Sequence, residues 1–323
     1  MKKKVTVWAP ANIAFIKFWG KRDEELRLPM NSSISINLSN VFTITSVEFD
    51  ENLTDDEVNL DGRVVSGKEK NRITKHLDRI RKMAGVNKRA KVESKNNFPA
   101  GTGMASSASG FAALSLAASS ALEMRLGERE LSILARVGSG SACRSIPDGW
   151  VEWQEAKTSN GSYAYSMYGL KHWGVCDVVA VVERAKKGVS STEGHALVES
   201  SPFYKSRIAR MKEKVRDIKK SIKEKNFSKF GEILEAEAIN MHAVMMTSDP
   251  ELIYWSPETL RIILKVKEWR EGGLETYFTI DAGPNVHVIC LERDAHKVEK
   301  LLRTIRGVRM VIVNRVAQGA HLV

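Results

Sequence analysis

The hydrophobic pattern of this chain changes near residues 184–190, and this change limits how the chain can fold. Before it, short alternating runs typical of strands are interspersed with helical segments. After it, apolar residues recur at spacings of three and four, as on one helix face, at Ile208, Met211, Val215, Ile218 and Ile222. The 323 residues also exceed the ~250–300 at which a single core usually stops growing. We therefore predict two domains, at residues 1–186 and 187–323.

Turn, cap and periodicity signals predict individual elements within these domains. In the first we expect strands at about 5–8, 34–38, 41–49, 58–60, 63–65, 90–94, 150–153 and 177–182, and helices at about 69–84, 106–124 and 128–137. In the second we expect helices at about 205–225, 230–241, 257–271 and 295–306, and strands at about 276–280, 286–291 and 309–313. Gly85 is a stop signal, and Ser256 followed by Pro257 is a start signal.

Composition excludes several classes of protein. The apolar fraction of 43% is too high for a wholly disordered chain, and no apolar run approaches the ~18 residues of a membrane-spanning helix. Three distant cysteines, Cys143, Cys176 and Cys290, argue against a disulfide framework or a zinc site. We therefore expect a cytoplasmic protein. The net charge of +11 leaves nucleic acid, an anionic membrane surface and small polyanions open as partners.

The glycine-rich segment Phe98–Ser107 follows a predicted strand and opens a predicted helix. Free N–H groups at such a helix start bind anions, and glycines let the backbone approach a phosphate closely. A flexible turn with a serine cap explains the same residues. A second segment, Gly138–Ser145, places Ser139, Ser141 and Arg144 among glycines and suits a diphosphate, or else is a plain surface loop.

Three further segments are ambiguous when each is considered alone. Asp281 precedes a Gly-Pro turn, where an acid is either catalytic or turn-forming. Lys17 and Lys21 are four residues apart. Either the two lysines face one anion, or both are simply solvated. The predicted helix 205–225 carries ten Lys and Arg against three acids, which indicates either a nucleic-acid surface or a solvated outer face.

Taken together, these segments resemble the diphosphomevalonate decarboxylases of the GHMP kinase superfamily. The family's opening motif is similar to Ala9-Pro-Ala-Asn-Ile-Ala-Phe-Ile-Lys-Phe-Trp-Gly-Lys-Arg22. Further similar segments follow in family order, at residues 28–35, 96–107, 138–145, 189–194 and 279–285. The resemblance therefore covers nearly the whole chain.

The resemblance implies an α+β fold, with a half like ribosomal protein S5 at the N-terminus and a ferredoxin-like half at the C-terminus. It implies a reaction in which ATP phosphorylates the 3-hydroxyl of mevalonate 5-diphosphate. Loss of that phosphate and of CO₂ then gives isopentenyl diphosphate, in the mevalonate route to isoprenoids. ATP and Mg²⁺ are the implied cofactors, and a cytoplasmic homodimer that binds neither nucleic acid nor membrane is implied. Decarboxylation of the 5-monophosphate is the nearest alternative, and a nucleic-acid-binding protein is the alternative of another class.

The resemblance also implies roles for individual residues. Asp281 is implied as the general base, with Lys17 beside it and Ser107 near the transferring phosphoryl group. The implied substrate-binding residues are Asn12, Phe18, Trp19, Gly20, Lys21, Arg72, Ser139, Gly140, Ser141, Ala142, Cys143, Arg144 and Thr192. The implied ATP-binding residues are Asn97, Pro99, Gly101, Thr102, Gly103, Ala105, Ser106 and Ser107. Phe18 stands where the family usually has Tyr, which removes a hydroxyl beside the substrate.

Overall fold

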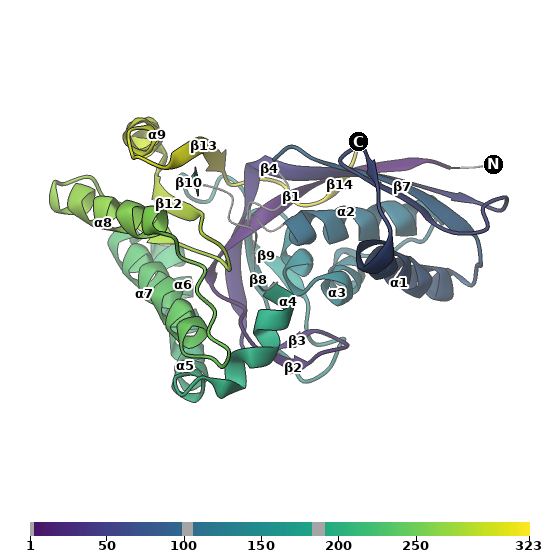
Figure 1. Ribbon diagram of the computed structural model, residues 1–323, viewed down its shortest axis with the longest axis horizontal. Helices are drawn as coiled ribbons and strands as arrows, with labels where there is room; N and C mark the ends of the chain where they lie inside the picture. The colour runs from purple at the N-terminus through teal and green to yellow at the C-terminus, as the bar shows by residue number, and fades with distance from the viewer. Residues whose placement is uncertain (1–2, 99–105, 183–190) are drawn as a thin grey trace.

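The N-terminal half is built on an eight-stranded sheet in the computed structural model, which describes residues 3–98, 106–182 and 191–323. Its strands are β1 (Val5–Ile16), β4 (Ser33–Asp50), β5 (Glu57–Leu60), β6 (Arg63–Val64), β7 (Arg89–Asn96), β8 (Trp150–Trp153), β9 (Ala164–Tyr168) and β14 (His321–Leu322). Helices α1 (Gly67–Ala84), α2 (Ser106–Ala121) and α3 (Glu128–Gly138) lie along one face of this sheet (Figure 1). A small hairpin, β2 (Lys21–Asp23) and β3 (Leu28–Pro29), projects beside them.

The C-terminal half has a four-stranded antiparallel sheet in the order β11-β12-β10-β13. These strands are β10 (Val175–Val182), β11 (Thr276–Thr279), β12 (Val286–Leu291) and β13 (Val308–Arg315). Its helices are α4 (Ser191–Gly194), α5 (Tyr204–Ala209), α6 (Met211–Glu224), α7 (Phe227–Met246), α8 (Pro257–Glu271) and α9 (Ala295–Arg303). Because β10 pairs with two strands from the end of the chain, the sheet includes residues on both sides of the predicted domain boundary. That boundary lies outside the described residues and stays a prediction.

Several predicted elements differ from the structure in their extent. The two strands predicted around Ser39 and Asn40 are one long strand, because β1 pairs with β4 on both sides of that point. The strand predicted to stop at Pro10 continues to Ile16 after a register shift, so Lys17 directly follows a strand. The predicted helix 205–225 is two helices, α5 and α6, and the strands and α-helices that were not predicted are β2, β3, β9, β14 and α4. The stop at Gly85 and the cap at Ser256 are confirmed.

An apolar core joins the two halves. The ring of Phe15 from β1 meets Phe230 from α7 edge-on, with centroids 4.8 Å apart. Trp150 from β8 stacks on Trp173 at 5.8 Å, and Ile218 and Ile289 belong to the same buried cluster. Burying large aromatic side chains is strongly stabilising. The end of β1 is therefore held firmly between the two halves.

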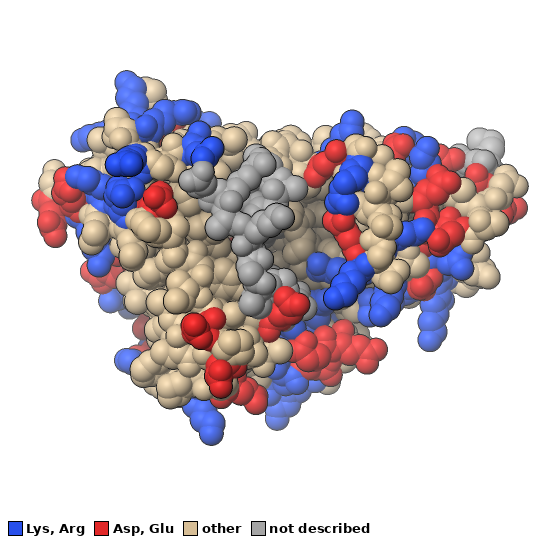
Figure 2. All heavy atoms as spheres, viewed as in Figure 1, with Lys and Arg blue, Asp and Glu red and all other residues tan. Residues whose placement is uncertain are grey.

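Charged side chains are distributed over both halves. In Figure 2 the face between the halves is hollowed, and Lys and Arg side chains border the hollow on the side of the N-terminal half. Several Lys and Arg side chains of α6, in the C-terminal half, form ion pairs with acids, including Lys214 with Glu237 and Lys219 with Glu152. In the described ranges, no helix combines the length and apolar character needed to cross a membrane.

Two buried histidines predict how stability depends on pH. Burial lowers the pKa of His76 and of His242 to about 3. An unfolded histidine titrates near ~6.5, so below that pH the unfolded chain binds protons that the folded chain does not. Stability should therefore fall as the pH falls. Each histidine should account for about 1.4 kcal/mol of lost unfolding free energy between about pH 7.5 and about pH 5.5.

Urea unfolding of the His76→Gln variant at both pH values tests this expectation. The variant should lose about 1.4 kcal/mol less than the wild type over the same interval, whatever the substitution costs at a fixed pH. His296→Gln is the matched control because the His296 side chain is 76% exposed. An identical pH dependence in His76→Gln and wild type would contradict the account.

Candidate active site

A lysine and an aspartate from opposite halves form an ion pair at the centre of the candidate site. Lys17 directly follows β1, and Asp281 comes two residues after β11. Lys17 Nζ donates to Asp281 Oδ1 at 2.6 Å. The lysine side chain is 2% exposed and the aspartate 30%, so the pair is reached from the aspartate side. The structure thus brings together two residues that are 264 positions apart.

The surrounding charges keep this carboxylate ionised. Burial by itself raises the pKa of Asp281, but the nearby Lys17, His287 and Arg144 together bring that pKa below its ordinary value. Burial likewise lowers the pKa of Lys17, and the attraction of Asp281 opposes that change. An ionised carboxylate within hydrogen-bond reach of a hydroxyl can accept its proton. The geometry therefore suits Asp281 to act as a general base.

Arg144 is the second buried cation of the site. It lies on the 3₁₀ turn Gly140–Ser145, where it is 3% exposed. Its Nε and Nη2 donate to Asn12 Oδ1 at 3.1 and 2.8 Å, and its Nη1 donates to Ser33 Oγ at 3.1 Å. Asn12 Nδ2 donates in turn to the Ser141 carbonyl and to Ser145 Oγ. The guanidinium is thus oriented by β1 and β4, and among the described residues two of its N–H groups stay available to a ligand.

A pocket of about 650 Å³ lies between the sheet and helices α1 and α2. Its apolar lining consists of Leu60, Ile73, Val92, Phe111 and Leu114, and its polar lining includes Thr43, Ser94, Asn96, Ser106 and Ser107. A small-molecule site commonly combines an apolar lining with a few polar groups. The predicted ATP-binding residues Ser106 and Ser107 therefore open onto a cavity large enough for a nucleotide.

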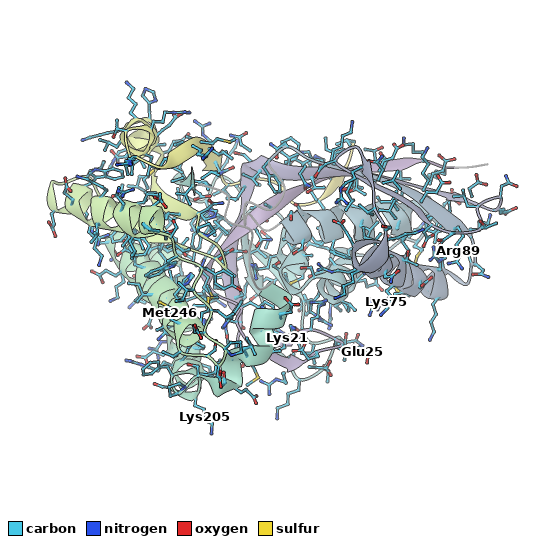
Figure 3. All side chains as sticks on the ribbon, viewed as in Figure 1. Lys21, Glu25, Lys75, Arg89, Lys205 and Met246 are labelled. Carbon is cyan, nitrogen blue, oxygen red and sulfur yellow. The ribbon has the colours of Figure 1, made fainter. Side chains whose placement is uncertain are left out.

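Arg72 connects this pocket to a smaller, basic one. It lines the large pocket and also a cavity of about 160 Å³ beside Arg27, Lys75 and Arg79. Its Nη2 donates to the Gly138 carbonyl at 3.1 Å, and burial lowers its pKa to about 10. Figure 3 shows Lys75 and Glu25, which also line the cavity, on the same side of the N-terminal half. Four cations against two acids make this cavity suited to an anion.

The hydroxyls of Ser107 and Ser139 connect the large pocket to the Gly140–Ser145 turn. Ser107 Oγ lies 3.1 Å from Ser139 Oγ. Ser139 is the residue before the turn that carries Arg144. The predicted phosphoryl-transfer residue thus lies beside the predicted substrate-binding segment.

The loop between β1 and β2 is packed against His195 of the C-terminal half. The His195 ring lies 4.3 Å from the Phe18 ring and 4.5 Å from the Trp19 ring, between centroids. The Gly20 N–H donates to His195 Nδ1 at 2.9 Å, and burial lowers the pKa of His195 well below its ordinary value. Gly20 has φ +102°, and a Cβ there would collide with Tyr204. A glycine is therefore required at this position.

Other predicted site residues have more local roles in the structure. Ala142 and Cys143 are buried in apolar clusters, and burial raises the pKa of Cys143 to about 12. The Asn97 amide bonds to the main chain of Asn40 and Phe42. The Lys21 side chain is 1% exposed and pairs with Glu24 at 2.5 Å. Pro99, Gly101, Thr102, Gly103, Ala105 and the Thr192 side chain lie outside the described residues.

Family models and known proteins similar to this chain agree on its family. Residues 9–164 match the diphosphomevalonate decarboxylase-like N-terminal domain, and residues 177–319 match the mevalonate 5-diphosphate decarboxylase C-terminal domain. The chain belongs to the diphosphomevalonate decarboxylase family. It is 36% identical over 310 residues to the diphosphomevalonate decarboxylase of Debaryomyces hansenii, covering 90% of this chain and 80% of that protein.

Solved structures of this family have the same fold. The mevalonate diphosphate decarboxylase of Staphylococcus aureus matches with a TM-score of 0.95 and 38% identity, over 100% of this chain and 98% of that one. A structure named MDDEF, in complex with MVAPP, AMPPCP and magnesium, matches with a TM-score of 0.94 and 34% identity, over 100% and 99% of the two chains. The predicted α+β GHMP kinase fold is therefore confirmed.

Sequence reasoning missed two parts of this site. His195 begins a short 3₁₀ segment, His195–Ser200, without a recognisable motif, and its position becomes visible only when this segment packs against the Phe18–Gly20 loop. Arg27 was missed because the bend between β2 and β3 resembles an ordinary charged turn. The cluster of three arginines and a lysine forms only when this bend meets α1. Neither arrangement leaves a local signal in the sequence.

Proposed function

We propose that this protein catalyses the ATP-dependent decarboxylation of mevalonate 5-diphosphate to isopentenyl diphosphate, ADP, phosphate and CO₂. The observation that carries the proposal is the ion pair between Lys17 and Asp281, which lies between the halves and beside Arg144. The large pocket that Ser106 and Ser107 line supports an ATP site in the N-terminal half. The family assignment and the related complex that holds MVAPP, AMPPCP and magnesium support the same reaction.

The reaction begins when Asp281 accepts the proton of the 3-hydroxyl as that oxygen attacks the γ-phosphorus of ATP. ADP leaves as the new O–P bond forms. The C3–O bond of the resulting 3-phosphate then breaks, and inorganic phosphate leaves with the bonding electrons. The electrons of the C–CO₂ bond move to C3 and complete the double bond of isopentenyl diphosphate, while CO₂ departs. No separate electron sink is required, because the departing phosphate itself accepts the electrons.

The cations divide between the two ends of the substrate in this proposal. The sequence indicated a diphosphate contact for Arg144, but its guanidinium lies close enough to Asp281 and Lys17 to influence both pKa values. We therefore assign it instead to the end that carries the carboxylate. A guanidinium binds a carboxylate with its planar pair of N–H groups. Lys21 and Arg72, together with Ser139 and Ser141, are then assigned to the diphosphate end. Phe18, Trp19 and Gly20 are assigned to the part of the site between these two ends.

Magnesium fits this site through the nucleotide phosphates. The described residues contain no group of three or more His, Cys, Asp or Glu side chains arranged to hold a metal. Mg²⁺ prefers oxygen ligands and is commonly held by substrate phosphates, water and one or two protein oxygens. The Ser107 and Ser139 hydroxyls are such oxygens beside the large pocket. When bound, the ion would offset the negative charge of the phosphates.

We also propose that the protein works in the cytoplasm as a homodimer, as the family resemblance implies. Sedimentation of the purified protein at several concentrations tests the assembly. A single species with twice the mass of one chain is the expected result, and a single species with the mass of one chain would contradict it.

A comparison of two substrates tests the proposed reaction. We expect ADP release with mevalonate 5-diphosphate to exceed that with mevalonate 5-phosphate by at least ~10-fold in kcat/KM, because a second phosphate adds charge-assisted hydrogen bonds worth ~1.5–3 kcal/mol each. A coupled ADP assay on both compounds at equal Mg²⁺ provides the measurement. Equal or better turnover of the monophosphate would assign the protein to the alternative reaction.

A further inference from the structure

The main chain of Lys17 is held by a buried ion pair from the C-terminal half. The Lys17 N–H donates to Glu237 Oε1 at 3.3 Å, and the Lys17 carbonyl accepts from Arg207 Nη2 at 3.2 Å. Arg207 and Glu237 also bond directly to each other, and both side chains are 0% exposed. The Glu237 carboxylate and the Arg207 guanidinium thus hold the main-chain N–H and carbonyl of Lys17.

These contacts replace strand hydrogen bonds at the point where the strand has ended. β1 ends at Ile16, so Lys17 lies beyond the ladder that fixes the residues before it. Arg207 lies on α5 and Glu237 on α7, which belong to the other half of the molecule. Hydrogen bonds to charged groups are about twice as strong as neutral ones. The ion pair therefore fixes Lys17 relative to the half that carries Asp281.

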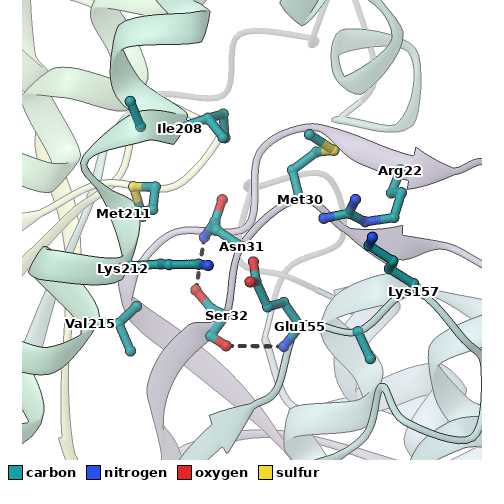
Figure 4. Close-up of a pocket in the computed structure, with 12 residues that line it drawn as sticks. Arg22, Met30, Asn31, Ser32, Glu155, Lys157, Ile208, Met211, Lys212 and Val215 are labelled. Carbon is teal, nitrogen blue, oxygen red and sulfur yellow. Dashed lines mark hydrogen bonds between the residues drawn. The ribbon is translucent and has the colours of Figure 1, made fainter.

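The other polar atoms of this pair also have partners, except Arg207 Nε, which has none among the described residues. Glu237 Oε2 accepts from Lys214 Nζ at 2.7 Å, and Arg207 Nη1 donates to Met211 Sδ at 3.3 Å. Asn31 Nδ2 donates to the same Lys17 carbonyl at 3.1 Å. Asn31 and Met211 also line a pocket of about 550 Å³ (Figure 4). The main chain of Lys17 is thus fixed by these contacts, while its side chain extends toward Asp281.

A gain in folding stability does not explain why a charged pair occupies this buried position. Replacing a buried ion pair with well-packed apolar residues is often neutral or even stabilising. This pair fixes the orientation of Lys17, because its two members bond to the N–H and the carbonyl of that residue. Its negative member also favours the charged form of Lys17 against the effect of burial.

We propose that Arg207 and Glu237 are positioning residues for the decarboxylation, which act by holding the main chain of Lys17 so that its ammonium meets Asp281. This inference rests on the proposed function. It assigns a part in the reaction to two residues that do not touch the substrate. A shift of ~1 Å in a catalytic group can lower a rate by ~10²-fold, even when the change lies away from the chemistry.

The Glu237→Gln variant tests the inference, because it keeps the shape of the side chain and removes its charge. We expect kcat for isopentenyl diphosphate formation to fall roughly 10- to 100-fold, while the KM for mevalonate 5-diphosphate changes less than about 3-fold. Arg207→Lys is the second variant, since it keeps the charge but loses the fork, and its kcat should fall by a smaller factor. Glu213→Gln on α6 is the matched control, because it makes the same substitution at an exposed site.

Combining Glu237→Gln with Asp281→Asn distinguishes positioning from a general loss of structure. If Glu237 acts through the Lys17–Asp281 pair, its substitution should lower kcat less than about 3-fold in the Asp281→Asn background. Losses that multiply fully in the double variant would overturn the inference, as would a normal kcat in the Glu237→Gln variant. A wild-type protein that forms no isopentenyl diphosphate would overturn the proposed function, and the inference with it. An active wild type with an unaffected Glu237→Gln variant would overturn the inference alone.

Discussion

Replacing Asp281 with Asn should lower the rate of isopentenyl diphosphate formation at least ~10²-fold, the usual scale for loss of a general base. The amide has nearly the same shape but cannot accept the hydroxyl proton. It also leaves the buried Lys17 ammonium without its 2.6 Å partner. Both effects act on the reacting end of the substrate. Binding of ATP in the pocket beside Ser107 should change little.

Quantifying ADP and isopentenyl diphosphate together shows which step this substitution blocks. We expect both products to fall in parallel, because Asp281 acts at the phosphoryl-transfer step that precedes decarboxylation. Asp55→Asn is the matched control, since that carboxylate is 65% exposed and pairs with Lys70 on the surface. A near-normal yield of isopentenyl diphosphate from Asp281→Asn would remove this residue from the proposed role.

Replacing Arg144 with Lys should lower kcat/KM for mevalonate 5-diphosphate roughly 10- to 100-fold, since hydrogen bonds to charged groups are worth ~1.5–3 kcal/mol each. The ammonium keeps the charge but cannot reproduce the planar fork. It also cannot donate at once to Asn12 and Ser33 with the geometry of the guanidinium. We expect most of the loss to appear as a higher KM for the mevalonate substrate.

Steady-state kinetics with each substrate varied in turn checks this expectation. The KM for ATP should change less than about 3-fold, because the large pocket is lined by other residues. Arg293→Lys provides the matched control, as its side chain is 74% exposed. An unchanged KM for the mevalonate substrate, or an equal rise in both KM values, would contradict the assignment of Arg144 to the substrate.

Local signals predicted most helices and strands because they depend on neighbouring residues. Gly85 adopts the left-handed conformation expected at the end of α1, and Ser256 caps α8 with Thr259. The long strand β4 was predicted as two strands, because Ser39 and Asn40 are typical turn residues and their contacts with distant residues are not evident from the sequence. In the structure Leu38 bridges to Val316, and Asn40 bonds to Asn314, so contacts from the end of the chain stabilise the extended conformation.

The candidate site depends on contacts that periodicity and spacing do not encode. Lys17 and Asp281 were paired by resemblance to a family, and the structure shows the contact itself. Arg207 was counted among the basic residues of the predicted helix 205–225, and Glu237 lay within the predicted helix 230–241 without a motif around it. Their role depends on how α5 and α7 pack against the end of β1. Long-range packing of this kind is visible only in the folded chain.

The measurement that tests the account most directly is the product stoichiometry of the purified wild-type protein. With mevalonate 5-diphosphate, ATP and Mg²⁺, we predict that ADP, phosphate, CO₂ and isopentenyl diphosphate form in equal amounts. ADP formed without CO₂ would show that the protein stops at 3-phosphorylation, and would contradict the claim that this site carries the reaction through decarboxylation.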